Sequence, residues 1–124
     1  LARPEVQIVA TEPQNASLLA GGTFTPHKIQ GWTPDFVPKV LDRRVVDRIV
    51  PVSDDESLET ARALASQEGI FCGISCGGTF AAALKVARAA EPGSVVLAML
   101  PDTGERYLST ALFAHLPEGS DPEP

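Results

Sequence analysis

Two segments of this chain share one layout: a short apolar run, a break at glycine, and then a helical pattern. They are Gly73–Thr79 (GISCGGT) and Leu100–Thr110 (LPDTGERYLST). A strand that opens onto a helix in this way is the repeating unit of a parallel α/β sheet, and such sheets bind small ligands at the edge where their strands end. Ser75 places a hydroxyl at that edge. The sequence therefore predicts an open, mainly parallel sheet with flanking helices in three α/β/α layers, and a ligand site near Ser75.

The rest of the chain continues the alternation of strands and helices. Ser53 and Glu56 have the spacing of a capping box at the start of a helix, and Gly69 is placed to end that helix. The continuous apolar run at 95–100 is typical of a parallel strand covered on both faces. We expect strands at 6–10, 47–52, 70–74 and 95–100, with helices at 14–20, 54–68, after the glycines at 77–78, and at 105–115.

Charge and length limit the functions open to this chain. Its 124 residues carry a net charge of −6 and no basic stripe, which argues against nucleic acid as a partner. No apolar run approaches the roughly 20 residues that a membrane-spanning helix needs, and no signal peptide precedes the first strand, so we expect a cytoplasmic protein without a membrane partner. Because Leu1 is not methionine, the chain is expected to begin inside a longer sequence. We divide it into one domain at 1–116 and an acidic, proline-rich tail at 117–124 that we expect to be disordered.

The two cysteines, Cys72 and Cys76, leave two interpretations open. Two ligands at this spacing cannot fill a tetrahedral metal site, so we expect no bound metal. The first interpretation is a pair of reduced thiols in the core. The second is a reactive Cys76, because the N-terminus of a helix lowers the pKa of a thiol.

The two opening segments, together with Thr11–Pro13, His27–Gly31 and Phe36–Asp42, resemble the C-terminal part of the cysteine synthases, or O-acetylserine sulfhydrylases. The resemblance runs from about residue 5 to Leu116. Members of that family are longer, and the part missing here would precede Leu1. They are pyridoxal-phosphate enzymes of fold type II, the fold of the tryptophan synthase β-chain. The resemblance therefore implies part of the larger domain of such an enzyme.

The resemblance also implies roles for single residues. Ser75 matches the serine that hydrogen-bonds the pyridine nitrogen of the cofactor, although the residue pattern by itself equally suits a helix cap. Pro101 and Asp102 would border the same pocket, where Asp102 otherwise suits a turn that caps the next helix. Gly31 and Trp32 would lie in the substrate-side loop. There the bulk of Trp32–Asp35 replaces the family's small residues, and we expect it to narrow the entrance.

No catalytic residue is assigned, because none of the lysines at 28, 39 and 85 lies in a segment resembling that of the Schiff-base lysine, which is expected upstream of Leu1. By resemblance the complete enzyme makes cysteine from O-acetylserine and sulfide. It would be a homodimer and would bind the C-terminal tail of serine acetyltransferase. Two alternatives stay open: an enzyme of the cystathionine β-synthase type, and a non-catalytic fragment that acts as a binding module.

Overall fold

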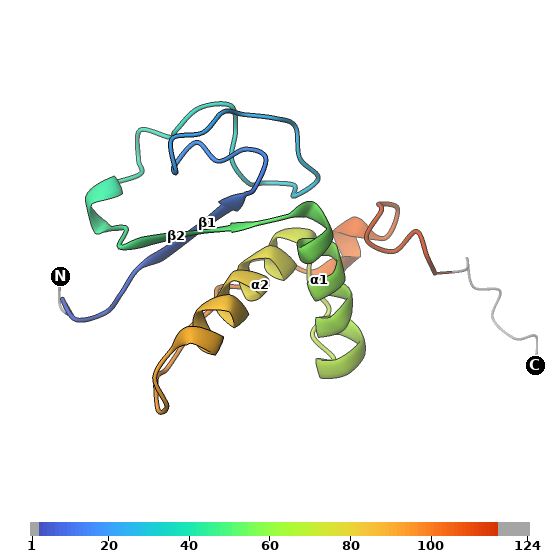
Figure 1. Cartoon of the computed structure of the whole chain (residues 1–124). Helices are drawn as coiled ribbons and strands as arrows, with labels where there is room; N and C mark the ends of the chain where they lie inside the picture. Colours follow the sequence, from blue (N-terminus) through green and yellow to red (C-terminus); the bar gives the residue numbers. More distant parts are fainter. Residues whose placement is uncertain (1–2, 117–124) are drawn as a thin grey trace, which may run out of the picture.

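The computed structural model describes residues 3–116, so the tail expected at 117–124 lies outside the described residues. Its centre is a parallel pair of strands, β1 (Val9–Pro13) and β2 (Arg48–Val52), with Val9 opposite Arg48 and Pro13 opposite Val52. Two helices, α1 (Asp54–Glu68) and α2 (Ile74–Ala89), lie on one side of this pair, and the long connection between the strands lies on the other (Figure 1). The α/β class and the parallel pairing are thus confirmed.

Helix α1 begins and ends where the sequence predicts. The Ser53 hydroxyl accepts the Glu56 N–H at 3.1 Å, and the Glu56 carboxylate accepts the Ser53 N–H at 2.8 Å, which completes the capping box. At the other end, Gly69 takes a left-handed φ of 69°, a conformation that glycine adopts without steric cost. Local sequence therefore determines both ends of this helix.

The strand expected at 70–74 is a short, unpaired link, because α2 already begins at Ile74. Gly77 and Gly78 consequently lie inside the helix instead of forming a turn before it. A Cβ on Gly77 would stand 2.0 Å from the Ser57 carbonyl oxygen and 2.8 Å from the Ala61 Cβ. The two glycines are needed for the close crossing of α1 and α2.

The segment expected to form a strand at 95–100 is extended but pairs with no strand among residues 3–116. Its side chains alternate: Val95, Leu97 and Met99 are 95%, 92% and 71% exposed, whereas Val96, Ala98 and Leu100 line a hollow of about 250 Å³ against α2. This is the geometry of a strand without neighbours to complete its hydrogen bonds. The described part of the sheet has two strands where four were expected.

Three other expected elements also differ. β1 starts three residues later than the run 6–10, because the backbone pairs only where β2 lies beside it. Residues 14–20 form turns instead of the expected helix, and Ala16 in this segment makes an isolated antiparallel bridge with Phe24. The last helix is reduced to the 3-10 turn η2 (Gly104–Tyr107), followed by turns up to 115. The other short 3-10 element, η1 (Arg43–Val45), precedes β2.

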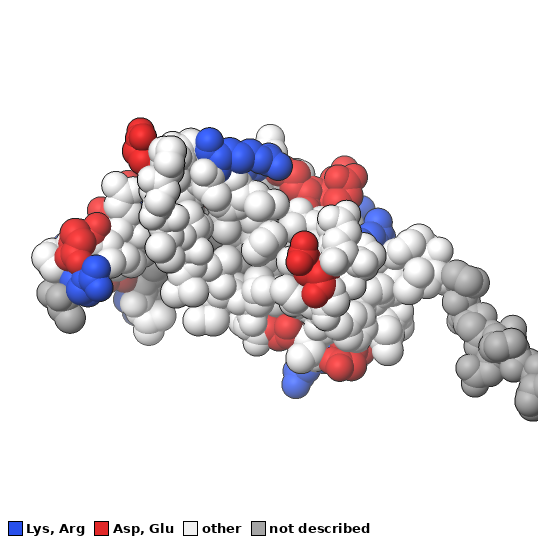
Figure 2. Space-filling view, turned by 90° about the horizontal axis from the view of Figure 1, so that it is seen from below, with Lys and Arg blue, Asp and Glu red and all other residues white. Residues whose placement is uncertain are grey.

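The connection between the strands is irregular but well anchored. The Glu12 side chain is fully buried, and its carboxylate accepts the backbone N–H groups of Leu19 and Ala20 at 2.8 and 3.0 Å. Ile29 is also fully buried and packs into the core cluster formed by both helices and the C-terminal turns, and half-buried Trp32 packs against the same cluster. Charged side chains are sparse and scattered over the face seen from below the helices (Figure 2). Among residues 3–116 no helix is both long and apolar enough to cross a bilayer.

Candidate functional site

Ser75 is the second residue of α2 and is only 6% exposed. The residue that caps this helix is Gly73, which has no side chain, and no side-chain hydroxyl serves as the cap. The Ser75 carbonyl accepts the Thr79 hydroxyl at 3.0 Å, but among residues 3–116 no protein group hydrogen-bonds the Ser75 hydroxyl itself. The helix-cap interpretation of Ser75 is therefore not observed. A hydroxyl at a buried helix start is left to bind something else.

Asp102 lies against the start of the same helix. Its Oδ1 accepts the Gly73 N–H at 3.2 Å and the Cys76 thiol at 2.9 Å, and its Oδ2 accepts the Tyr107 hydroxyl. Asp102 thus contacts the N-cap residue of α2 from a segment 29 residues further along the chain. The sequence suggested a cap for the following turn, but η2 has Thr103 at its start and no side-chain cap. Pro101, which precedes it, is exposed.

Burial and the nearby Asp102 carboxylate make Cys72, Cys76 and Tyr107 hard to deprotonate. Burial, followed by the neighbouring Cys76 thiol, raises the pKa of Cys72 to about 12. Burial and the hydrogen bond to Asp102 raise the pKa of Cys76. The same carboxylate, with burial, raises the pKa of Tyr107 to about 12. Both cysteines are free, buried thiols, so the first interpretation agrees with the structure and the reactive Cys76 does not.

The loop that carries Gly31 and Trp32 reaches α2 as well. Gly31 has a φ of 85° and is exposed, which lets the chain turn so that Trp32 faces inward. A Cβ on Gly78 would stand 2.7 Å from the Trp32 ring, so the indole lies on the helix face one turn after Ser75. His27 holds the loop: its Nδ1 accepts the Ile29 N–H at 3.2 Å, and its Nε2 is 3.1 Å from the Thr33 carbonyl oxygen. The structure therefore brings Ser75, Asp102 and Trp32 to the start of one helix.

Comparison with known proteins identifies the family. Residues 1–102 match the pyridoxal-phosphate dependent enzyme family. The chain belongs to this family. It is 58% identical over 121 residues, 98% of its length, to O-ureido-L-serine synthase of Streptomyces lavendulae, and 41% identical over 111 residues to cysteine synthase of Staphylococcus aureus. It spans 37% and 36% of the lengths of these two relatives.

Solved structures agree on the fold. The crystal structure of O-ureido-L-serine synthase superposes with a TM-score of 0.90 over 97% of this chain and 38% of that one. Cysteine synthase of Entamoeba histolytica, at 36% identity, gives 0.84 over 93% of this chain and 34% of that one. This pyridoxal-phosphate dependent chain therefore has the fold of the corresponding third of those enzymes.

The residues described fit one part of a pyridoxal-phosphate site. The Ser75 hydroxyl, in the first turn of α2, is a neutral group without a hydrogen-bond partner among residues 3–116, and it could donate to an acceptor such as a ring nitrogen. The three lysines lie away from Ser75 in exposed or paired positions. Lys28 and Lys39 are exposed, and the Lys85 ammonium binds the Glu56 carboxylate at 2.7 Å and the Pro51 carbonyl oxygen at 3.0 Å.

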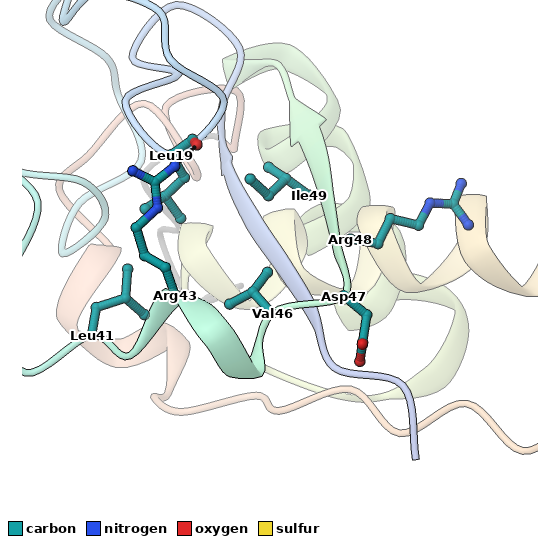
Figure 3. A pocket seen from close by; sticks show the side chains of 7 residues that line it. All are labelled: Leu19, Leu41, Arg43, Val46, Asp47, Arg48 and Ile49. Carbon is teal, nitrogen blue, oxygen red and sulfur yellow. Dashed lines mark hydrogen bonds between the residues drawn. The ribbon is translucent and has the colours of Figure 1, made fainter. Parts of the chain in front are cut away.

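A second hollow, of about 220 Å³, lies away from these residues. Figure 3 shows apolar side chains grouped beside Arg43, with Arg48 and Asp47 pointing away from them. The Arg43 guanidinium donates to the Leu19 carbonyl oxygen, and Asp47 accepts the Ile8 N–H at 2.7 Å. Two of the charged side chains that line this hollow, Arg43 and Asp47, therefore already have partners within the chain. The lining residues are Leu19, Leu41, Arg43, Val46, Asp47, Arg48 and Ile49.

Sequence reasoning missed Glu12 and Tyr107 as organising residues. Glu12 lies in a strand, where a carboxylate is usually solvent-exposed, and its two backbone partners follow in an irregular loop. The single tyrosine of the chain was visible in the sequence, but a pairing with Asp102 depends on the turn between them. Within residues 3–116 no cluster of three or more metal-binding side chains occurs.

Proposed function

We propose that this chain is the C-terminal portion of a cysteine synthase. The complete enzyme would replace the acetoxy group of O-acetyl-L-serine with sulfide: the bond from Cβ to the ester oxygen breaks, a bond from Cβ to sulfur forms, and acetate leaves. Atoms and charges balance without an oxidant or reductant. The observation that supports the proposal most directly is the family match over residues 1–102, in which the free Ser75 hydroxyl lies.

Bound pyridoxal phosphate would supply an electron sink for the Cα–H bond that must be broken before acetate can leave. The residues of this chain would bind the cofactor and orient its ring. Ser75 would hold the ring nitrogen with a neutral hydroxyl at a helix N-terminus, where the helix dipole disfavours positive charge. A ring kept neutral in this way suits elimination and addition at Cβ more than transamination. Pro101 and Asp102 would form the neighbouring wall.

The identities of the two relatives favour a second candidate, in which the nucleophile is N-hydroxyurea instead of sulfide. The relative that is 58% identical is named for O-ureido-L-serine, whereas the cysteine synthase is 41% identical. Both products are L-serine-derived and differ in the group carried on Cβ. Trp32 on the α2 face that carries Ser75 supports a substrate entrance unlike that of the small-residue loops. The nucleophile that yields an O-ureido group is the oxygen of N-hydroxyurea.

The experiment compares nucleophiles in the protein at its natural length, loaded with pyridoxal phosphate. O-acetylserine is added with sulfide, N-hydroxyurea or homocysteine, and acetate release and the amino-acid product are measured by mass spectrometry. We expect cysteine to form with the highest kcat/KM. A preference for N-hydroxyurea would replace the cysteine synthase proposal with the second candidate. A preference for homocysteine would indicate the cystathionine β-synthase type.

The 124-residue chain alone should release no acetate, since none of its lysines is placed for cofactor attachment. Turnover by the isolated chain, or none by the full-length protein with any nucleophile, would contradict the proposal. The homodimer and the binding of a serine acetyltransferase tail belong to the same proposal. Both are checked by sedimentation of the full-length protein with and without a peptide ending in that tail.

A further inference from the structure

The start of α2 is held by a strap formed by residues 102–107. Two hydrogen bonds join this strap to the segment before the helix: the Gly73 N–H donates to the Asp102 side-chain Oδ1 at 3.2 Å, and the backbone N–H of Gly104 donates to the Phe71 carbonyl oxygen at 3.2 Å. Tyr107, at the far end of the strap, donates its hydroxyl to Asp102 Oδ2. The tyrosine is buried against the core.

The fit between strap and helix leaves no free space. A Cβ on Gly73 would stand 2.5 Å from both Asp102 Oδ1 and the Tyr107 ring. A Cβ on Gly104 would stand 2.6 Å from the Phe71 ring. Residues 71–73 and 102–107 therefore have one tightly packed arrangement, and a shift of the strap requires a shift of the first turn of α2.

At this turn the Asp102 carboxylate, and not the Ser75 hydroxyl, accepts a backbone N–H, that of Gly73. A carboxylate at a helix N-terminus satisfies unpaired N–H groups and interacts favourably with the helix dipole. Asp102 reaches the start of α2 from outside the helix and accepts the N–H of the N-cap residue Gly73 and the Cys76 thiol. The Ser75 hydroxyl, which the sequence also suited to a cap, has no hydrogen-bond partner among residues 3–116 and lies in the same turn as this contact.

We propose that Asp102 and Tyr107 are positioning residues: Tyr107 orients the Asp102 carboxylate, the carboxylate holds the first turn of α2, and the turn fixes the Ser75 hydroxyl for the cofactor ring. The inference rests on the proposed cofactor role of Ser75, and it adds two residues whose effect on the ring is indirect.

The test uses Asp102→Asn and Tyr107→Phe in the protein at its natural length. Tyr107→Phe removes only the hydroxyl, so it remains informative if Asp102→Asn fails to fold. The first measurement is hydrogen exchange of the peptide covering 71–79, read by mass spectrometry without any need for cofactor. We expect exchange to accelerate about tenfold or more in both variants, since local opening of the helix start becomes easier.

The second measurement is the visible absorbance of bound pyridoxal phosphate. We expect both variants to shift the band in the same direction as Ser75→Ala, while Ser75→Ala leaves exchange of 71–79 unchanged. Asp47→Asn is the matched control, because Asp47 also accepts a backbone N–H, that of Ile8, but lies before β2 and away from α2. It should change neither measurement.

Unchanged exchange in both variants would overturn the strap, and faster exchange with an unshifted cofactor band would overturn the positioning role. If the protein binds no pyridoxal phosphate at all, the proposed function fails and with it the positioning role, while the exchange measurement still decides whether the strap holds the helix start.

Discussion

Single side chains tie the irregular parts of this chain to its strands and helices. The Arg62 guanidinium on α1 donates to the carbonyl oxygens of Leu112 and Ala111 at 2.8 and 2.6 Å, which holds the C-terminal turns against the helix. Glu12 does the same for the turn after β1, and Asp102 for the start of α2. Each of these side chains satisfies backbone groups that have no partner in a regular element.

At this scale we expect stability to fall in alkaline solution. The pKa of Cys72 rises from 9.0 to about 12, and that of Tyr107 from 10.0 to about 12. Between the unfolded and folded values the folded state binds more protons than the unfolded state, so the free energy of unfolding decreases as the pH rises from about 9 to about 12. Below about pH 9 the contribution of these two groups to the free energy of unfolding is fully retained.

The melting temperature measured across this pH range checks the expectation. Tyr107→Phe should melt at a lower temperature at neutral pH, because the hydrogen bond to Asp102 is lost, but its decline above pH 9 should be shallower than that of the wild type. Ser66→Ala, which removes an exposed hydroxyl, is the control and should keep the wild-type slope. Parallel slopes in all three proteins would show that the phenol does not contribute.

Among the elements, those determined by neighbouring residues could be predicted from the sequence, and those determined by distant partners could not. The capping box at Ser53 and the left-handed Gly69 are local, and α1 has the expected bounds. The glycines at 77 and 78 suggested a turn, because a helix interior ordinarily avoids them. Their reason is the surface of α1, which no local pattern contains. Ser75 was predicted at a helix start, but the Asp102 contact at the same turn joins residues 29 positions apart, which no local pattern reveals.

Because α1 and α2 cross closely, we expect a glycine-to-alanine substitution at this crossing to destabilise the protein, although the same change usually stabilises a helix. An alanine normally stabilises a helix by about 1 kcal/mol relative to glycine. At position 77 the added Cβ would meet backbone atoms of α1 that cannot move aside, such as the Ala61 nitrogen at 2.7 Å. We expect Gly77→Ala to lower the free energy of unfolding by about 1–3 kcal/mol.

Chemical denaturation measures this change. Gly78→Ala is the matched comparison, because there the Cβ would meet the Trp32 ring and the Ser57 hydroxyl, side chains that can adjust, so the loss should be smaller. If Gly77→Ala stabilised the protein, helix propensity would outweigh the crossing and the close approach of α1 and α2 would be wrong.

The described part of the molecule has an extended apolar segment that is not paired into its sheet. The extended segment at 94–100 has no strand partner among residues 3–116, and three of its apolar side chains point to solvent. Relatives of this chain are more than twice as long, and the chain matches them over nearly its whole length. The apolar run at 95–100 therefore has the composition of a buried strand because, in the proposed complete enzyme, further strands would cover it.

We expect the 124-residue chain to self-associate through this segment and to bind apolar dyes. Leu97→Lys should reduce self-association, measured by sedimentation, without lowering the melting temperature, since Leu97 is 92% exposed. Leu64→Lys is the control: Leu64 is buried, so the same substitution there should unfold the chain. A wild-type chain that sediments as a monomer and binds no dye would contradict the expectation.

Parallel pairing also sets an order of events during folding. Thr11 of β1 meets Val50 of β2 across 39 residues, whereas α1 and α2 are joined by a short link. Closing a long loop costs more chain entropy than closing a short one, so the helical pair forms early and the two strands join late. On the ribosome, β1 is synthesised before β2, and the two strands can pair only after the whole intervening loop and β2 have been made. Throughout that interval the backbone groups of β1 that will bond to β2 are without that partner.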